Sequence, residues 1–148
     1  MNAPDYTLLD QDRNPVSLSD FSGQRVVVFF YPKAMTPGCT VEACDFRDSY
    51  EEFLAAGMAV VGLSPDPPDV LAEFREKEGL PFPLLSDADH KMAEAFGAWG
   101  VKKLYGRETV GLIRSTFVLG SDGELEREYR NVRATGHVAR LKRDLLGA

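Results

Sequence analysis

The sequence has 148 residues but only two cysteines and two histidines, which limits the metal and disulfide chemistry open to it. His90 and His137 lie far from each other and from the cysteines, without the paired spacing typical of zinc ligands. Two cysteines are also too few for a disulfide framework. In a reducing compartment they indicate catalysis or redox sensing.

Signals for nucleotides, nucleic acids and membranes are missing as well. There is no glycine-rich phosphate loop and no dinucleotide fingerprint, so we expect no cofactor beyond the thiols. No apolar segment approaches the length of a membrane span, and the start lacks a basic region followed by an apolar stretch. Seventeen basic against 23 acidic residues give a net charge of −6, without a dense basic cluster. We expect a soluble, cytoplasmic protein that binds neither nucleic acid nor membrane.

The apolar content of 44% is ordinary for a globular protein, and the length suffices for one domain, residues 1–148, with a sizeable core. Residues 97–111 show no clear period, so we predict a loop there that contains Trp99. The predicted strands are 5–9, 16–18, 25–31, 58–63, 113–119 and 125–130, with 81–85 extended. The predicted helices run from Thr36, over 69–78, from Ser86 and Asp87 through Phe96, and from Thr135 and Gly136 onward.

The order of these elements predicts the fold class. Strand, helix and strand over residues 25–63 imply a right-handed parallel crossover. Ser121-Asp122-Gly123 is a hairpin turn between the last two strands, which adds an antiparallel pair. We therefore predict an α/β protein with a mixed central sheet flanked by helices on both faces and an N-terminal β-hairpin extension. This order is compatible with a thioredoxin-like fold.

Both cysteines lie in the stretch 26–47, around which the chain is organised. The apolar run that ends at Pro32 is typical of a strand buried on both faces. Thr36 is a good N-cap and Pro37 is tolerated at the first helical position, so Cys39 lies in the first turn of a helix. Free backbone N–H groups and the positive end of the helix dipole favour the thiolate there, and the thiolate is the nucleophile.

Helical geometry separates the two cysteines. At about 100° per residue, Cys44 lies about 140° away from Cys39 around the helix. Their Cα atoms would be about 9 Å apart, whereas a disulfide needs about 4.4 to 6.8 Å. A bond between them would therefore require the first turns of the helix to unwind. The apolar stripe expected to face the sheet contains Cys39, Ala43, Phe46, Tyr50, Phe53 and Leu54.

The segment 31–48 resembles the active-site segment of the peroxiredoxins, specifically the peroxiredoxin Q or bacterioferritin comigratory protein type. The general motif is Pro, three residues, Thr or Ser, two residues and Cys, which Pro32, Thr36 and Cys39 match. A second cysteine five residues on marks the Q type, and Cys44 fills that position.

The resemblance continues through residues 80–87, 96–99 and 111–117 and covers nearly the whole chain. In one departure, Ala34 stands where many members carry an acidic residue. The resemblance implies a thioredoxin-like fold, a hydroperoxide substrate, and a leaning toward a monomer.

The chemistry assigns roles to the motif residues. Cys39 would attack the peroxide and become a sulfenic acid. The Thr36 hydroxyl and the backbone N–H groups of Gly38 and Cys39 would donate hydrogen bonds to the thiolate or the peroxide. By resemblance, Arg114 would reach the peroxidatic cysteine. Cys44 would then form an intramolecular disulfide, and thioredoxin or a similar dithiol would reduce it.

Each of the other candidates has an ordinary structural alternative. Arg114 could be a solvated strand arginine, although the strand face it would share is partly apolar. Glu42 could hydrogen-bond Arg114, but carboxylates on helix surfaces are usually solvated. Pro32 would shield the thiolate from water or simply end the strand. Tyr31 and Trp99 could line the mouth of the pocket, with core packing as the alternative for Tyr31.

Other functions remain open from the residues alone. A one-cysteine peroxidase would leave Cys44 idle, and an outside thiol would attack oxidised Cys39 directly. A thioredoxin-fold binding or holdase protein would use the cysteines only to sense oxidants. A general disulfide exchanger is disfavoured, because such proteins resemble Cys-x-x-Cys and the gap here is four residues.

Overall fold

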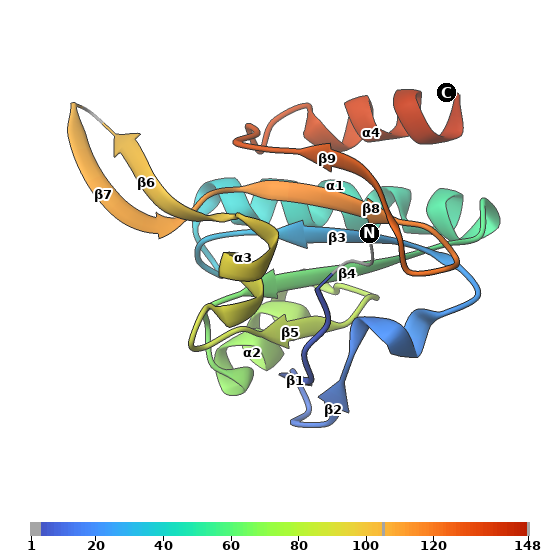
Figure 1. Cartoon of the computed structure of the whole chain (residues 1–148), viewed down its shortest axis with the longest axis horizontal. Helices are drawn as coiled ribbons and strands as arrows, with labels where there is room; N and C mark the ends of the chain where they lie inside the picture. Colours follow the sequence, from blue (N-terminus) through green and yellow to red (C-terminus); the bar gives the residue numbers. More distant parts are fainter. Residues whose placement is uncertain (1–3, 105, 148) are drawn as a thin grey trace.

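The computed structural model describes residues 4–104 and 106–147, and its centre is a seven-stranded sheet in the order β2-β1-β5-β4-β3-β8-β9 (Figure 1). β3, β4 and β5 are parallel, and the remaining pairs are antiparallel. The mixed sheet and its N-terminal hairpin, β1 with β2, confirm the predicted fold class. The strands are β1 (Leu8–Asp10), β2 (Pro15–Val16), β3 (Arg25–Phe30), β4 (Met58–Ser64), β5 (Leu84–Ser86), β8 (Ser115–Leu119) and β9 (Leu125–Tyr129).

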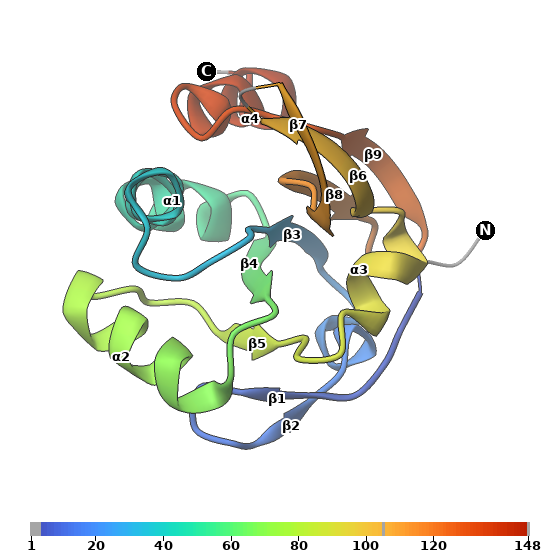
Figure 2. The ribbon, with the colours of Figure 1, turned by 90° about the vertical axis from the view of Figure 1, so that its left-hand side faces the viewer.

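Helices cover both faces of the sheet (Figure 2). α1 (Pro37–Ala55), α2 (Pro68–Glu78) and α4 (His137–Leu146) lie on one face, which holds a core cluster that includes Cys39. The short helix α3 (Lys91–Phe96) and the 3-10 turn η1 (Leu18–Phe21) supply residues to a second cluster on the other face. β3 lies between the two clusters and contributes side chains to both.

The composition of β3 explains its central place. Val27 and Phe29 point into the first core, whereas Val28 and Phe30 point into the second, and all four are fully buried. The Phe29 ring stacks on Phe46 of α1 with ring centroids 4.4 Å apart. Burial of apolar area on this scale supplies most of the favourable free energy of such a fold. It also fixes α1, and the cysteine at its start, against the sheet.

The predicted loop over residues 97–111 is wrong, because most of it forms a hairpin of β6 (Trp99–Leu104) and β7 (Arg107–Leu112). The hairpin projects from the body of the protein beside the carboxyl end of β3 (Figure 1). Val101 and Val110 pair across it, yet they are 61% and 66% exposed. The base of the hairpin packs against the second core through Trp99 and Leu112, but residues 107–110 of β7 are exposed, so the sequence there shows no alternation of apolar and polar residues and carried no strand signal. Residue 105 lies outside the described residues.

Several strand boundaries differ from the prediction: β2 is Pro15–Val16 and not 16–18, β5 is Leu84–Ser86 and not 81–85, and β8 and β1 begin later than predicted. β8 begins at Ser115 and not at Ile113: the Ile113 N–H donates to the Ala98 carbonyl (2.7 Å), and the Arg114 carbonyl accepts a hydrogen bond from Val132 N (2.9 Å). β1 begins at Leu8, because the Asp5 carboxylate accepts a hydrogen bond from Leu18 N (2.8 Å) and belongs to the following turn.

Two helix faces also differ. Leu54, predicted to face the sheet, is 46% exposed, because it lies in the last turn of α1 beyond the core. Buried Glu42 occupies helix surface that the predicted stripe did not include. α3 begins only at Lys91, with His90 as its N-cap residue, although the Asp87 carboxylate still accepts hydrogen bonds from the second and third helical N–H groups, Met92 N at 3.0 Å and Ala93 N at 2.8 Å.

His137 begins α4 and makes the stability of the fold depend on pH. Its Nε2 lies 2.7 Å from Thr116 Oγ1, and burial, with Arg140 and Arg114 nearby, lowers its pKa to about 4. The unfolded chain takes up this proton near the ordinary value of 6.5, so protonation favours unfolding as the pH falls from about 6.5 to about 4.

We expect the variant His137→Gln to lose less of its stability across this acidic window than the wild type. The difference in the free energy of unfolding between His137→Gln and the wild type should change by up to about 3 kcal/mol between neutral pH and about pH 4. Urea denaturation at a series of pH values measures it. His90→Gln is the matched control and should retain the acid loss. An equal loss in His137→Gln would contradict the assignment to His137.

Candidate active site

Cys39 lies where the loop after β3 turns into α1, at the carboxyl end of the parallel strands (Figure 1). Thr36 is the N-cap residue, with extended backbone angles of φ −83° and ψ 156°, and Pro37 occupies the first helical position. The predicted start of the helix is therefore confirmed. Cys39 stands in the first turn and is only 1% exposed, so its sulfur is held away from bulk water.

The loop that leads to Cys39 is held by the next parallel strand. Met35 adopts a positive φ of 65°, which is unfavourable for a residue with a side chain. The neighbouring Ala34 N–H donates to Asp66 Oδ2 at 2.7 Å, and the Ser64 hydroxyl donates to the same oxygen at 2.8 Å. Sequence reasoning missed Asp66, although its place just beyond the carboxyl end of β4 was a usable signal.

Arg114 reaches Cys39 from the residue before β8. Its Nη2 donates to Cys39 Sγ at 3.3 Å and its Nη1 donates to Glu42 Oε1 at 2.7 Å. Gly38 leaves room for this guanidinium, since a Cβ built there would lie 3.2 Å from Arg114 Nη2. The structure thus brings together four predicted site residues from two distant segments.

The Glu42–Arg114 pair is withdrawn from solvent. The Glu42 side chain is fully buried and the Arg114 side chain is 15% exposed, so neither is the solvated surface group of the alternative explanation. Burial raises the pKa of Glu42 to about 7, against the opposing effect of Arg114. Burial lowers the pKa of Arg114, but Glu42 and Cys39 outweigh it and the net direction is upward. Arg114 is therefore a permanent cation shared between a carboxylate and a sulfur.

Thr36 and Pro32 lie in the loop between β3 and Cys39. The Thr36 hydroxyl donates to the Lys33 carbonyl at 2.7 Å, so in this structure it does not donate to the sulfur. Pro32 is half-buried, consistent with either its shielding role or its role in ending the strand.

The two aromatic candidates lie in different cores. Tyr31 is fully buried in the cluster that contains Cys39, which agrees with core packing. Trp99 packs against the other cluster and stacks on the His90 ring at 3.8 Å with an interplanar angle of 5°. The structure shows no contact of Trp99 with Cys39 among the described residues.

Both cysteines are free thiols, and Cys44 is partly exposed. Cys44 Sγ donates to Glu78 Oε1 at 3.5 Å, toward α2, and not to any atom of Cys39. Cys39 and Cys44, which helical geometry was expected to separate, therefore lie in two different environments on α1.

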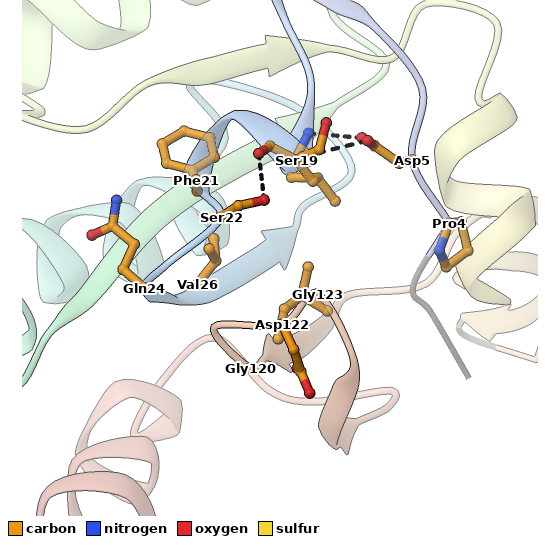
Figure 3. A pocket seen from close by; sticks show the side chains of 12 residues that line it. Pro4, Asp5, Ser19, Phe21, Ser22, Gln24, Val26, Gly120, Asp122 and Gly123 are labelled. Atoms are coloured by element: carbon orange, nitrogen blue, oxygen red, sulfur yellow. Dashed lines mark hydrogen bonds between the residues drawn. The ribbon is translucent and has the colours of Figure 1, made fainter.

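The rest of the described chain holds a pocket but no cluster that could bind a metal ion. A pocket of about 250 Å³ lies at the opposite end of the sheet, lined by Val26, Leu119 and the neighbouring turns (Figure 3). Within residues 4–104 and 106–147, no three His, Cys, Asp or Glu side chains are grouped so that they could hold a metal ion. None of the helices in the described part of the chain has the length and apolar character needed to span a bilayer.

Comparison with known proteins gives consistent matches. The AhpC/TSA family matches the chain over residues 1–128. Peroxiredoxin Bcp of Bacillus subtilis is 49% identical over 137 residues, which cover 93% of this chain and 87% of the relative. The bacterioferritin comigratory protein of Xanthomonas campestris, a solved structure, superposes with a TM-score of 0.90 at 34% identity, covering 96% of this chain and 90% of that one. Peroxidoxin BcpB of Mycobacterium tuberculosis superposes with a TM-score of 0.86 at 36% identity, covering 99% and 95%.

The fold and these matches define a thiol-dependent peroxidase built on the thioredoxin-like fold. The chain belongs to the AhpC/TSA family, and within it to the peroxiredoxins of the peroxiredoxin Q or bacterioferritin comigratory protein type. Proteins of this family use peroxide substrates and a thiol reductant. The resemblance stated from residues 31–48 is therefore confirmed.

Proposed function

We propose that the chain is a two-cysteine hydroperoxide reductase in which Cys39 is the peroxidatic residue and Cys44 the resolving one. The observation that carries the proposal is the position of Arg114, with Nη2 3.3 Å from Cys39 Sγ and Nη1 2.7 Å from buried Glu42. A fixed cation beside the sulfur stands where negative charge develops in the reaction.

In the first step the Cys39 thiolate attacks the nearer oxygen of the hydroperoxide. A sulfur–oxygen bond forms as the oxygen–oxygen bond breaks, and the leaving oxygen departs as hydroxide or alkoxide and takes up a proton. Arg114 and the backbone N–H groups of Gly38 and Cys39 are the donors for the two peroxide oxygens. We assign Thr36 a further donor role once its hydroxyl turns from the Lys33 carbonyl, and Pro32 the exclusion of water.

In the second step the Cys44 thiolate attacks the sulfenic sulfur of Cys39. A disulfide forms, the sulfur–oxygen bond breaks and hydroxide leaves, which becomes water by taking up the equivalent of the proton that the Cys44 thiol released. Because Cys44 faces α2 in the folded protein, the first turns of α1 must unwind before this step. Thioredoxin or a similar dithiol then reduces the disulfide by exchange.

The proposal also covers the substrates, the oligomeric state and the cellular role. We propose hydrogen peroxide and organic hydroperoxides as substrates; alkyl peroxide reduction is an activity of the related X. campestris protein. We further propose that residues 1–148 act as one domain, as a cytoplasmic monomer, in antioxidant defence. We assign Tyr31 to core packing in the cluster that also contains Cys39, and we assign no role at the sulfur to Trp99, which packs against the other cluster.

The variant Cys44→Ser tests the two-cysteine cycle. Its thioredoxin-dependent turnover should fall at least about 100-fold, because the disulfide that thioredoxin reduces cannot form. Its first reaction with peroxide, monitored as the loss of the free Cys39 thiol, should keep the wild-type rate. Unchanged thioredoxin-dependent turnover would instead establish the one-cysteine mechanism.

A further inference from the structure

Two donors of α1 converge on the last residue of α2. Cys44 Sγ donates to the Glu78 carboxylate at 3.5 Å, and Arg47 Nη1, one turn further along α1, donates to the Glu78 carbonyl at 2.6 Å. Glu78 ends α2, and Gly79 follows it in the left-handed conformation that closes the helix. These two hydrogen bonds hold the C-terminal end of α2 against α1, next to the turns of α1 that must unwind.

The surroundings of Cys44 on balance oppose its ionisation, with burial as the largest cause. Burial raises the pKa of the Cys44 thiol, Arg47 opposes this, and the hydrogen bond to Glu78 with the charges of Glu78 and Asp48 raises it further. The charged groups that face Cys44 are thus Arg47 and Asp48 from α1 and Glu78 from α2. Glu78 also stands at the C-terminal end of α2, the negative end of its dipole.

We propose that Glu78 is a positioning residue for the resolving step, whose carboxylate holds Cys44 as a hydrogen-bonded thiol on folded α1 until the helix unwinds. This inference rests on the proposed two-cysteine function. When α1 unwinds, the Cys44 sulfur leaves Glu78, loses its proton to solvent and attacks the sulfenic sulfur of Cys39. The disulfide forms and water leaves, so no outside oxidant or reductant is required.

The two cysteines have different neighbours in the resting protein. Cys39 accepts a hydrogen bond from the cation Arg114, whereas Cys44 donates one to the Glu78 carboxylate and also lies near the cation Arg47. The bonds to Glu78 also set how long the sulfenic acid persists before resolution, and hence how long it is exposed to a second peroxide molecule.

The first test measures Cys44 alone, in a Cys39→Ser background that needs no peroxidase activity. The rate of alkylation by iodoacetamide is followed from about pH 6 to about pH 10, because it reports the thiolate fraction. Glu78→Gln keeps the shape of the side chain and removes its charge. It should shift the alkylation profile to lower pH and raise the rate at neutral pH about threefold or more. Glu76→Gln, an exposed glutamate of the same helix, is the matched control and should leave the profile in place.

A second variant separates electrostatics from simple loosening. Arg47→Met also breaks a bond between α1 and Glu78, but it removes a cation that favours the thiolate, so its profile should shift to higher pH. If Glu78 acted only by holding the helices together, both variants would raise the rate equally at all pH values. That result, or an unshifted profile in Glu78→Gln, would overturn the inference.

The second test uses the two-cysteine protein and one equivalent of hydrogen peroxide. In Glu78→Gln, the disulfide should form about threefold or more faster after sulfenic acid formation than in Glu76→Gln or the wild type. Equal rates of disulfide formation would overturn the role of Glu78 while leaving the proposed function intact. Absence of a disulfide in the wild type would overturn the proposed function itself, whatever the alkylation profiles show.

Discussion

Replacing Cys39 by Ser should reduce hydroperoxide reduction at least about 10⁴-fold, to the level of the uncatalysed reaction. A serine hydroxyl in the first turn of α1 remains protonated at neutral pH, and Arg114 cannot convert it into a nucleophile. Peroxide consumption with thioredoxin as the reductant measures this loss.

The fold of Cys39→Ser should be intact, because the substitution changes one buried atom. Its circular dichroism spectrum and urea midpoint provide that control. Retention of even a tenth of the wild-type activity in a correctly folded Cys39→Ser protein would exclude Cys39 as the peroxidatic residue and leave Cys44, the chain's other cysteine, as the candidate nucleophile.

The variant Arg114→Met should lower kcat/KM for hydrogen peroxide by about 10² to 10³, the usual effect of removing one donor to developing negative charge. Arg114 contacts both the sulfur and Glu42, so the same change also leaves a fully buried carboxylate without its cation. That second effect should cost about 1 to 3 kcal/mol in the free energy of unfolding, because Glu42, whose pKa is already raised to about 7, is then buried without its hydrogen-bond partner.

The double variant Arg114→Met with Glu42→Gln separates the two effects. A neutral amide in place of the carboxylate removes the unpaired charge, so most of the stability should return while the peroxide reaction stays slow. Stopped-flow kinetics and urea denaturation of the single and double variants measure both quantities. If activity returned together with stability, Arg114 would support the fold and not the chemistry.

The parts of the fold that bury apolar side chains were the parts that the sequence predicted. β3 was predictable because its side chains are buried on both sides, and α1 because Thr36 and Pro37 mark its start. The β6–β7 hairpin was not, since its paired Val101 and Val110 face solvent and leave no periodic signal.

The site shows the same division between local and long-range information. The place of Cys39 follows from capping rules within a few residues. The burial of Glu42 does not, because it depends on Arg114, 72 residues later in the chain. Asp66 and Glu78 likewise act on the loop and on Cys44 through hydrogen bonds between segments that only the fold brings together.

The measurement that tests the central claim most directly is mass spectrometry of the reduced protein after one equivalent of hydrogen peroxide, on intact chains and on non-reduced peptides. Cys39→Ser and Cys44→Ser are treated alongside. We expect a Cys39–Cys44 disulfide in the wild type, a trapped sulfenic acid at Cys39 in Cys44→Ser, and no prompt oxidation in Cys39→Ser. A wild-type protein whose Cys39 remains unoxidised under these conditions would contradict the account.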